Sequence, residues 1–451
     1  MAKTLDMTKG NPTKLMTAFA LPMIAANICQ MLYSVADSTV VGRVLGVQAF
    51  AAVGAAGFFY WFTIDIVLGL THGFEVLLAQ RFGKKDDLGL RRAIAMSALL
   101  TVALSLLLAI ASQAALNFVL RVIDTPEDIR ELTTLYLRWS LWGLPATAAY
   151  NLCSALLRAM GNSRTPLVSV IFSSVTNVLL NLLFAAVFHW GVAGVAAATV
   201  LSQLLSCLVC LWTLGKIPEI RLQAGDFRIH VPTVRELLRL GLPPALRNGV
   251  ISLGGFFIQR EINLYGTLFV AGFSASQRYF SLMVLIGSAL EGAVATYSGQ
   301  NYGAGDMDRV KSGMNSARWI ALVSSVLSAL LIILARKPLI SLLVSGSPED
   351  IAAIVKYGSQ NLVITVLALP SLYYLCIYRA SIQAMGDTLY PTLSGFTELI
   401  GRVAGVLLLP KFLGIWGIYM ASPLAWVFAH VLLVYGYHSV CRDRCSKLKL
   451  Y

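Results

Sequence analysis

Six acidic residues lie within long apolar segments, where an ionised side chain is costly and therefore points to a function. They are Asp37, Asp65, Glu75, Glu261, Glu291 and Glu398. A carboxylate in such a setting can bind a metal cation. It can also bind a proton, because loss of water favours its neutral form. The chemistry that these residues offer is the reversible binding of a positive ion.

The six acids are not equal candidates. Glu398 and Arg402 are four residues apart, so on a helix they would face each other, and a structural ion pair is the favoured interpretation. Glu75 lies near the end of its segment, where water could solvate it. Glu261 lies close to the counterpart of Asp37 in the internal repeat described below. We therefore keep Glu261 as a second candidate for binding an ion or the substrate.

Two amides share one face of a predicted helix. Asn177 and Asn181 are four residues apart in an apolar segment, which places one above the other on a helix. Amides inside a membrane often serve only to bind a neighbouring helix. Their oxygens can also bind a cation, and the pattern alone leaves both interpretations open.

The composition shows what must position these residues. Of the 451 residues 57% are hydrophobic and only 13% are charged, and the mean hydropathy is +0.73. Soluble domains have about 45–50% apolar and about 25% charged residues. Such an apolar excess can face lipid but cannot fit in a soluble core. The basic residues that give the chain its net charge of +13 lie in short loops between apolar segments. This placement favours contact with membrane lipids over binding to nucleic acid.

Apolar runs of the length needed to cross a membrane, roughly 20 residues, can be counted along the chain. The count predicts an all-α polytopic membrane protein with twelve transmembrane helices. The predicted spans are 15–44, 48–79, 92–122, 132–157, 166–188, 191–214, 236–264, 267–299, 308–343, 352–382, 389–411 and 414–438.

The basic residues predict the orientation. The termini and the loops on their side hold 23 lysines and arginines, whereas the opposite side holds about 7. Because basic loops stay in the cytoplasm, both termini are expected there, in a multi-pass protein of the cell (inner or plasma) membrane.

An internal repeat organises the chain. Motifs of the first half return in the second half in the same order, with an offset that drifts only from 220 to 226 residues. The paired motifs are Leu21-Pro22 with Leu242-Pro243, Gln80 to Gly83 with Gln300 to Gly303, Leu144-Pro145 with Leu369-Pro370, Ala159-Met160-Gly161 with Ala384-Met385-Gly386, and Trp190-Gly191 with Trp416-Gly417. Six spans per repeat is an even number, so both halves should insert the same way up.

The repeat predicts the domain boundaries. Residues 1–214 form an N-terminal six-helix lobe and 236–438 a C-terminal one. Residues 215–235 are expected to be a cytoplasmic linker, and 439–451 a cytoplasmic basic tail. Parallel repeats of this kind are typical of transporters whose substrate binds between the halves.

Several of these motifs together resemble the MATE (multidrug and toxic compound extrusion) family, in its bacterial form, over nearly the whole chain. The resemblance rests on four stretches in order: Leu21 to Arg43, Leu157 to Pro166, Gly191 to Thr199 and Gly299 to Gly305. It implies a V-shaped pair of six-helix lobes. It also implies efflux of amphiphilic, often cationic organic compounds in exchange for Na⁺ or H⁺, by alternating access.

The resemblance also implies a cation site in the N-terminal lobe. Asp37, Asn177, Asn181 and Thr199 match it, with Asp37 as the coupling-ion ligand and, if the ion is sodium, the metal ligand. The sequence departs from a common version of the family, which has an acid at the position of Asn181. The missing charge puts strong sodium binding in doubt.

Other functional classes are weaker. A lipid or oligosaccharide flippase of the same broad superfamily is the closest alternative, but such proteins often have fourteen spans. An enzyme is not expected, because the 5 histidines show no metal-ligand spacing and no nucleotide or nucleophile motif occurs. The sequence also leaves a channel or a receptor as alternative functional classes. Apart from the coupling ion, the sequence predicts no cofactor and no obligate protein partner.

Overall fold

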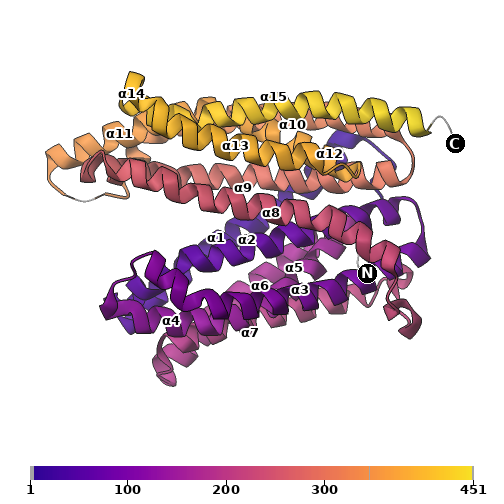
Figure 1. The fold of residues 1–451 in the computed structure, drawn as a ribbon, viewed down its shortest axis with the longest axis horizontal. Helices are drawn as coiled ribbons and strands as arrows, with labels where there is room; N and C mark the ends of the chain where they lie inside the picture. The colour runs from indigo at the N-terminus through magenta and orange to yellow at the C-terminus, as the bar shows by residue number, and fades with distance from the viewer. Residues whose placement is uncertain (1–4, 345, 449–451) are drawn as a thin grey trace. The chain divides into compact units, whose positions relative to one another are not determined.

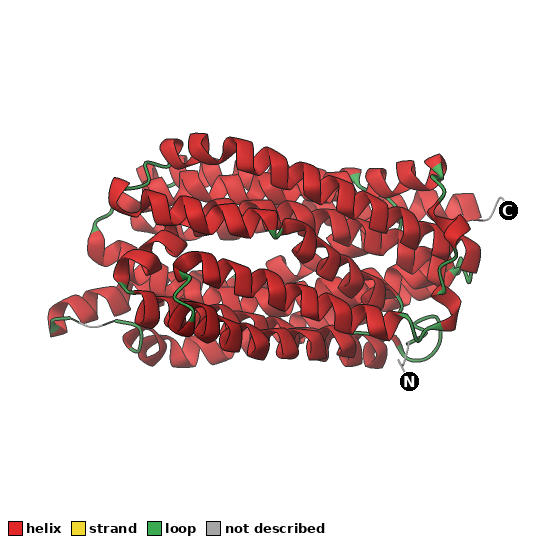
Figure 2. Ribbon diagram, turned by 90° about the horizontal axis from the view of Figure 1, so that it is seen from below, coloured by secondary structure: helices red, strands yellow, loops and turns green. Residues whose placement is uncertain are grey.

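A computed structural model describes residues 5–344 and 346–448. These residues form helices joined by short loops, and no strand occurs among them (Figure 2). The helical prediction is therefore confirmed.

The first half of the chain contains seven α-helices in six spans. They are α1 (Pro12–Val40), α2 (Val47–Gly83), α3 (Asp87–Val122), α4 (Glu127–Trp142), α5 (Leu144–Ala159), α6 (Arg164–Asn181) and α7 (Gly191–Leu214). Helices α1 and α6 each continue into a π-helix, η1 (Val41–Leu45) and η2 (Leu182–Val187). Two short 3₁₀ turns, η3 (Pro218–Ile220) and η4 (Ala224–Phe227), follow in the connecting segment.

The second half repeats this order. It contains α8 (Val231–Asn263), α9 (Thr267–Gly303), α10 (Met307–Ser341), α11 (Pro348–Leu367), α12 (Leu369–Ala384), α13 (Leu389–Leu408), α14 (Pro410–Leu413) and α15 (Ile415–Leu448) (Figure 1). Each of the twelve predicted spans coincides with one helix or one consecutive pair. Helix α15 continues beyond the predicted span, to Leu448.

Proline causes the break within the fourth span of each half. Pro145 and Pro370 stand in the first turns of α5 and α12, each directly after a short interruption. A proline lacks the N–H that would continue the preceding helix, so a new helix starts there. The axes of α11 and α12 differ by 46°.

Nine helices in the described part of the chain are long and apolar enough to cross a membrane, and the bent pair α11–α12 makes a tenth. The remaining two predicted spans correspond to α8 and to the pair α4–α5. Both carry more charge: α4 opens with Glu127 and Asp128, and α8 contains Arg239 and Arg247.

The helices form two compact units, which we describe separately. Unit 1 comprises Leu21–Gly249 and the stretch that ends at Asp6, and unit 2 comprises Met7–Ala20 and Val250–Tyr451. The start of α8 thus packs within unit 1, and the start of α1 within unit 2.

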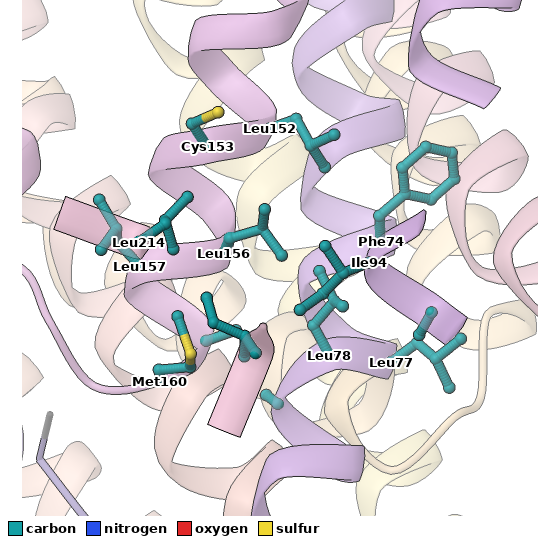
Figure 3. Close-up of a cluster of buried hydrophobic side chains, with 14 of the residues drawn as sticks. Phe74, Leu77, Leu78, Ile94, Leu152, Cys153, Leu156, Leu157, Met160 and Leu214 are labelled. Atoms are coloured by element: carbon teal, nitrogen blue, oxygen red, sulfur yellow. The ribbon is translucent and has the colours of Figure 1, made fainter. Parts of the chain in front are cut away.

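The largest buried apolar cluster of unit 1 joins α2, α3, α5 and α7. Phe74 and Leu78 of α2 contribute to it together with Ile94 of α3 and Leu156 of α5 (Figure 3). Leu237 and Leu240 belong to the same cluster and anchor the first turns of α8 there. This apolar packing fixes the helices that carry the polar residues described next.

Candidate functional site

A polar cluster in unit 1 brings together four residues from three helices. Asp37 comes from α1, Asn177 and Asn181 from α6, and Thr199 from α7. Asn181 lies 144 positions from Asp37 in the sequence, yet its side-chain Nδ2 donates a hydrogen bond to the carboxylate Oδ1 of Asp37. The four residues that were predicted to meet are therefore neighbours.

A chain of hydrogen bonds runs through this polar cluster. Asn181 Nδ2 also donates to Asn177 Oδ1 at 2.6 Å. Asn177 Nδ2 in turn donates to the hydroxyl oxygens of Thr199 at 3.3 Å and of Ser202 at 3.4 Å. The two amides lie on one face of α6, as their spacing predicted, and they connect α6 to both α1 and α7.

The cluster is buried but not fully satisfied. Asn177 and Asn181 are 0% exposed, and Asp37 is half-buried. Asn181 Oδ1 is a buried oxygen with no hydrogen-bond partner among the described residues. A buried acceptor without a partner is costly, so this atom suits contact with a bound cation or a donor.

Two residues of the cluster escaped the sequence analysis. Tyr33 lies four residues before Asp37 on α1, and its hydroxyl is 3.5 Å from Thr199 Oγ1. Ser202 lies three residues after Thr199 on α7 and accepts from Asn177. Their helical spacing from Asp37 and Thr199 is a signal that could have identified both.

The two backbone segments beside the cluster are unusual. Helix η1 begins four residues after Asp37, and η2 begins directly after Asn181. The two π-helices contact each other. π-helical turns within α-helices occur frequently at functional sites. Both helices that hold Asp37 and Asn181 therefore depart from regular geometry just beyond these residues.

The chemistry of the cluster is that of one carboxylate among neutral oxygens. Amide, hydroxyl and carboxylate oxygens are ligands for hard cations such as Na⁺, and the same carboxylate can take up a proton. Nowhere in the described ranges do three or more His, Cys, Asp or Glu side chains gather in a way that could hold a metal ion. The single charge suits a monovalent ion better than a divalent one.

Glu261 lies apart from this cluster. It stands in the last turn of α8, in unit 2, and is half-buried. Its side chain forms no ion pair or hydrogen bond within the described part of the structure. Its role as a second ion or substrate site stays a prediction.

Two other membrane acids are neutralised by arginine. Glu75, which was expected to be solvated, is only 4% exposed and pairs with Arg158 at 2.8 Å. Arg158 lies 83 residues further along the chain, so no local spacing revealed this pair. The predicted pair of Glu398 and Arg402 is confirmed, and Arg379 adds a second arginine at 3.2 Å from Glu398.

Comparison with known proteins supports the resemblance noted in the sequence. A family model described as MatE matches residues 22–183 and, a second time, residues 243–404, in agreement with the internal repeat. The chain is 33% identical to the probable multidrug resistance protein YpnP of Bacillus subtilis, over 68% of this chain and 69% of that protein. It is 26% identical to the probable multidrug resistance protein YoeA of the same organism, over 96% and 95% of the two chains.

Solved structures share the fold. A MOP superfamily transporter from Pyrococcus furiosus Vc1, whose binding pocket has reverse polarity, superposes with a TM-score of 0.89 at 23% identity, over 99% of both chains. The two matches to the family model cover most of the sequence and contain Asp37, Asn177 and Asn181. This chain belongs to the MATE family of multidrug efflux transporters.

Proposed function

We propose that this protein is a secondary active antiporter. It exports amphiphilic, cationic organic compounds in exchange for Na⁺ or H⁺, by alternating access. The family membership and the relatives named as multidrug resistance proteins support this class of function. The observation that carries the proposal is the buried polar cluster of Asp37, Asn177, Asn181 and Thr199.

The coupling ion would bind at Asp37. An arriving cation would take the place of the Asn181 amide hydrogens at the carboxylate, and the amide oxygens of Asn177 and Asn181 could then turn toward the ion. The buried Oδ1 of Asn181, which lacks a partner within the described part, is the atom that gains most from this rearrangement. A proton on Asp37 would neutralise the same charge.

Ion binding would shift the equilibrium between two conformations of unit 1. Asp37 lies on α1 and Asn181 on α6, so a change in their contact changes how these two helices meet. An ion can shift such an equilibrium only by its difference in affinity for the two states. The π-helices η1 and η2 are the segments where α1 and α6 can most readily change their hydrogen bonding.

The same proposal includes the membrane topology. The protein would lie in the cell membrane with both termini in the cytoplasm, as the positive loops on the side of the termini suggest. Attachment of a membrane-impermeable label to a single cysteine at either terminus, in intact cells and in inverted vesicles, tests this orientation.

Reconstituted protein tests the proposed exchange. Efflux of a fluorescent organic cation is measured from proteoliposomes with sodium and proton gradients imposed separately. Wild-type protein should respond to one of the two gradients. Asp37→Asn keeps the shape and removes the charge, so ion-driven efflux should fall to the background of empty liposomes, with a normal amount of folded protein.

A matched control is Asp128→Asn, which makes the same change at an exposed position in the first turn of α4. This variant should transport like the wild type. Wild-type ion-driven efflux by Asp37→Asn would refute the assignment of Asp37, and loss of the folded protein would indicate a structural role instead.

A further inference from the structure

Unit 2 contains a cavity of about 520 Å³ between α8, α9, α13 and α15. Arg278 and Arg402 line it together with the aromatic side chains of Phe280, Tyr419 and Trp426. Polar and apolar side chains contribute about equally to the wall, and a volume of this size is typical of sites for small organic molecules.

The internal repeat places this cavity where unit 1 has its polar cluster. Counting from the paired prolines and tryptophans of the repeat, each residue of the polar cluster has a counterpart in unit 2. Asp37, Asn177, Asn181 and Thr199 correspond to Ile258, Arg402, Val406 and Ala425. Three of these four counterparts, Ile258, Arg402 and Val406, line the cavity. The carboxylate of unit 1 has thus become an apolar residue, and one amide has become an arginine.

The cavity wall carries a positive charge. Arg379 and Arg402 both contact the carboxylate of Glu398, and Arg379 also interacts electrostatically with Glu291. Arg278 is exposed and forms no ion pair with any described residue. Among the described residues that line the cavity there is no aspartate or glutamate. Arg278 is thus a positive charge on this wall that no described carboxylate neutralises, and it favours an anion over a cation in the cavity.

Three buried donor groups on this wall have no acceptor. The Nε atom of Arg402, the indole Nε1 of Trp426 and the hydroxyl of Tyr419 are buried without a hydrogen-bond partner among the described residues. Arginine and the indole of tryptophan can only donate. A buried donor without an acceptor costs free energy, so a ligand whose acceptor oxygen reached one of these atoms, once the side chain had turned toward the cavity, would be stabilised.

Flat surfaces lie beside these donors. The rings of Phe280 and Trp426 stack with centroids 5.4 Å apart, and the Arg402 guanidinium lies 5.9 Å from the Trp426 ring. A planar aromatic ligand could lie against this set of rings while its charged group reaches the arginines.

We propose that the cavity of unit 2 binds an organic anion, in which a sulfonate, carboxylate or phosphate is attached to a planar aromatic body. This inference rests on the proposed function, because it assigns a second class of transported compound to the exporter. The exporter would accept anionic or zwitterionic compounds in unit 2 while unit 1 binds the coupling cation.

Equilibrium binding tests the inference without any transport step. The protein is placed in nanodiscs of neutral lipid, and equilibrium dialysis measures binding of 2-naphthalenesulfonate and of (2-naphthylmethyl)trimethylammonium, which have the same ring and opposite charge. The sulfonate should bind and the ammonium should not. Arg402→Gln and Arg278→Gln should each weaken sulfonate binding roughly tenfold or more, and Arg402→Lys should restore part of it.

Controls separate the cavity from general surface charge and from folding. Arg164→Gln changes an exposed arginine of unit 1 and should leave sulfonate binding unchanged. Arg402→Gln leaves Glu398 with its partner Arg379, so the protein should fold, and the exposed Arg278 gives an independent variant. Trp426→Phe keeps an aromatic ring and removes the orphaned N–H, so it should weaken sulfonate binding a few-fold.

Preference for the ammonium ion, or an equal loss of affinity in Arg164→Gln, would overturn the inference. Tighter binding of short-chain phosphatidylglycerol than of the sulfonate, with the same dependence on Arg402 and Arg278, would also overturn it and assign the cavity to a lipid headgroup. Because the assay contains no ion gradient, sulfonate binding can succeed while ion-driven efflux fails, and the two proposals are judged separately.

Discussion

Units 1 and 2 place charge at different positions of one repeated fold: Asp37 of unit 1 corresponds to the uncharged Ile258, and Arg402 of unit 2 to the uncharged Asn177. Unit 1 has a carboxylate, Asp37, bonded to the neutral amides of α6. Unit 2 has Arg402 at the counterpart of Asn177, and the counterpart of Ser173 is Glu398, which two arginines neutralise. The repeat therefore conserves the fold, whereas the polar and charged positions have diverged between the two units.

The last turns of α2 and α9 also differ between the two units. Arg81 binds Asp86 at 3.0 Å and Glu236 of α8 at 2.9 Å, so charge holds the start of α8 in unit 1. The corresponding residue of unit 2 is Asn301, whose amide donates to the backbone oxygen of Met7 at 3.1 Å. Met7 is fully buried. The guanidinium of Arg309 donates to the same oxygen at 3.1 Å, so hydrogen bonds to a backbone oxygen take the place in unit 2 of the ion pair in unit 1.

Removal of the shared carboxylate should have the largest effect. Glu398→Gln would remove the buried carboxylate that both Arg379 and Arg402 contact, and we expect a loss of about 3–5 kcal/mol in the free energy of unfolding. Thermal unfolding in detergent measures it. Glu75→Gln makes the same change in unit 1, where the carboxylate forms its ion pair with Arg158, and we expect a smaller effect than for the acid that two arginines contact. A larger effect of Glu75→Gln would contradict the picture of two arginines that depend on one acid.

Two glycines of α2 show how closely unit 1 packs. A methyl group on Gly73 would come within 2.2 Å of the backbone oxygen of Leu240 in α8, and the counterpart of Gly73 in unit 2 is Ala293. Gly73→Ala should therefore destabilise the protein by about 1–3 kcal/mol. Gly57→Ala makes the same change on the same helix with no atom within 4 Å, and should be neutral or slightly stabilising. Equal melting temperatures of the two variants would show that the close approach of α8 to α2 is not needed.

An acid at position 181 should add negative charge to the polar cluster of unit 1 and so increase its affinity for the coupling ion. Asn181→Asp would place a second carboxylate beside Asp37, and we expect the concentration of ion that gives half-maximal transport to fall by about tenfold, or 1.4 kcal/mol. Proteoliposome efflux at graded sodium and proton concentrations measures this value. Asn181→Leu, which offers no oxygen, is the opposite control and should raise it. An unchanged value in both variants would remove Asn181 from the ion site.

The smallest effect is expected at the cap of α3. Asp86 accepts from the backbone N–H of Gly89, and this bond, together with Arg81, holds the pKa of Asp86 below its ordinary value near 4. A lowered pKa adds stability that is complete above the ordinary value and is lost as the pH falls through the lowered one. Asp86→Asn should reduce stability by about 0.5–1 kcal/mol at pH 7.

The pH profile distinguishes the charge of Asp86 from its capping role. Asp86→Asn should flatten the decline in melting temperature between about pH 5 and pH 3 relative to the wild type. In unit 2, Asp306 caps α10 in the same way, by accepting from Arg309 N at 2.8 Å, but its neighbour at the position of Arg81 is uncharged. Asp306→Asn should therefore cost less than Asp86→Asn, and an equal loss would argue that the ion pair with Arg81 contributes nothing.

Much of this architecture follows from the sequence by itself. The apolar runs set the twelve helical segments, because a helix that faces lipid needs about twenty apolar residues. The paired loop motifs established the repeat, and the spacing of four residues put Asn177 beside Asn181 and Glu398 beside Arg402. All of these features depend on neighbours within one helix or on the order of helices along the chain.

Only the tertiary structure decided which distant groups meet. The pairing of Glu75 with Arg158 and the second arginine on Glu398 each join different helices and had no signal in the sequence. For Asp37 and Asn181 the resemblance predicted that they are neighbours, and the structure supplied the hydrogen bond between them. The unpartnered donors around the cavity of unit 2 are likewise a property of packing. In lipid the outward and inward faces of a helix are both apolar, so periodicity gives little sign of which face meets which neighbour. Close packing and the need to satisfy buried polar groups settle it, and both exist only once the helices have assembled.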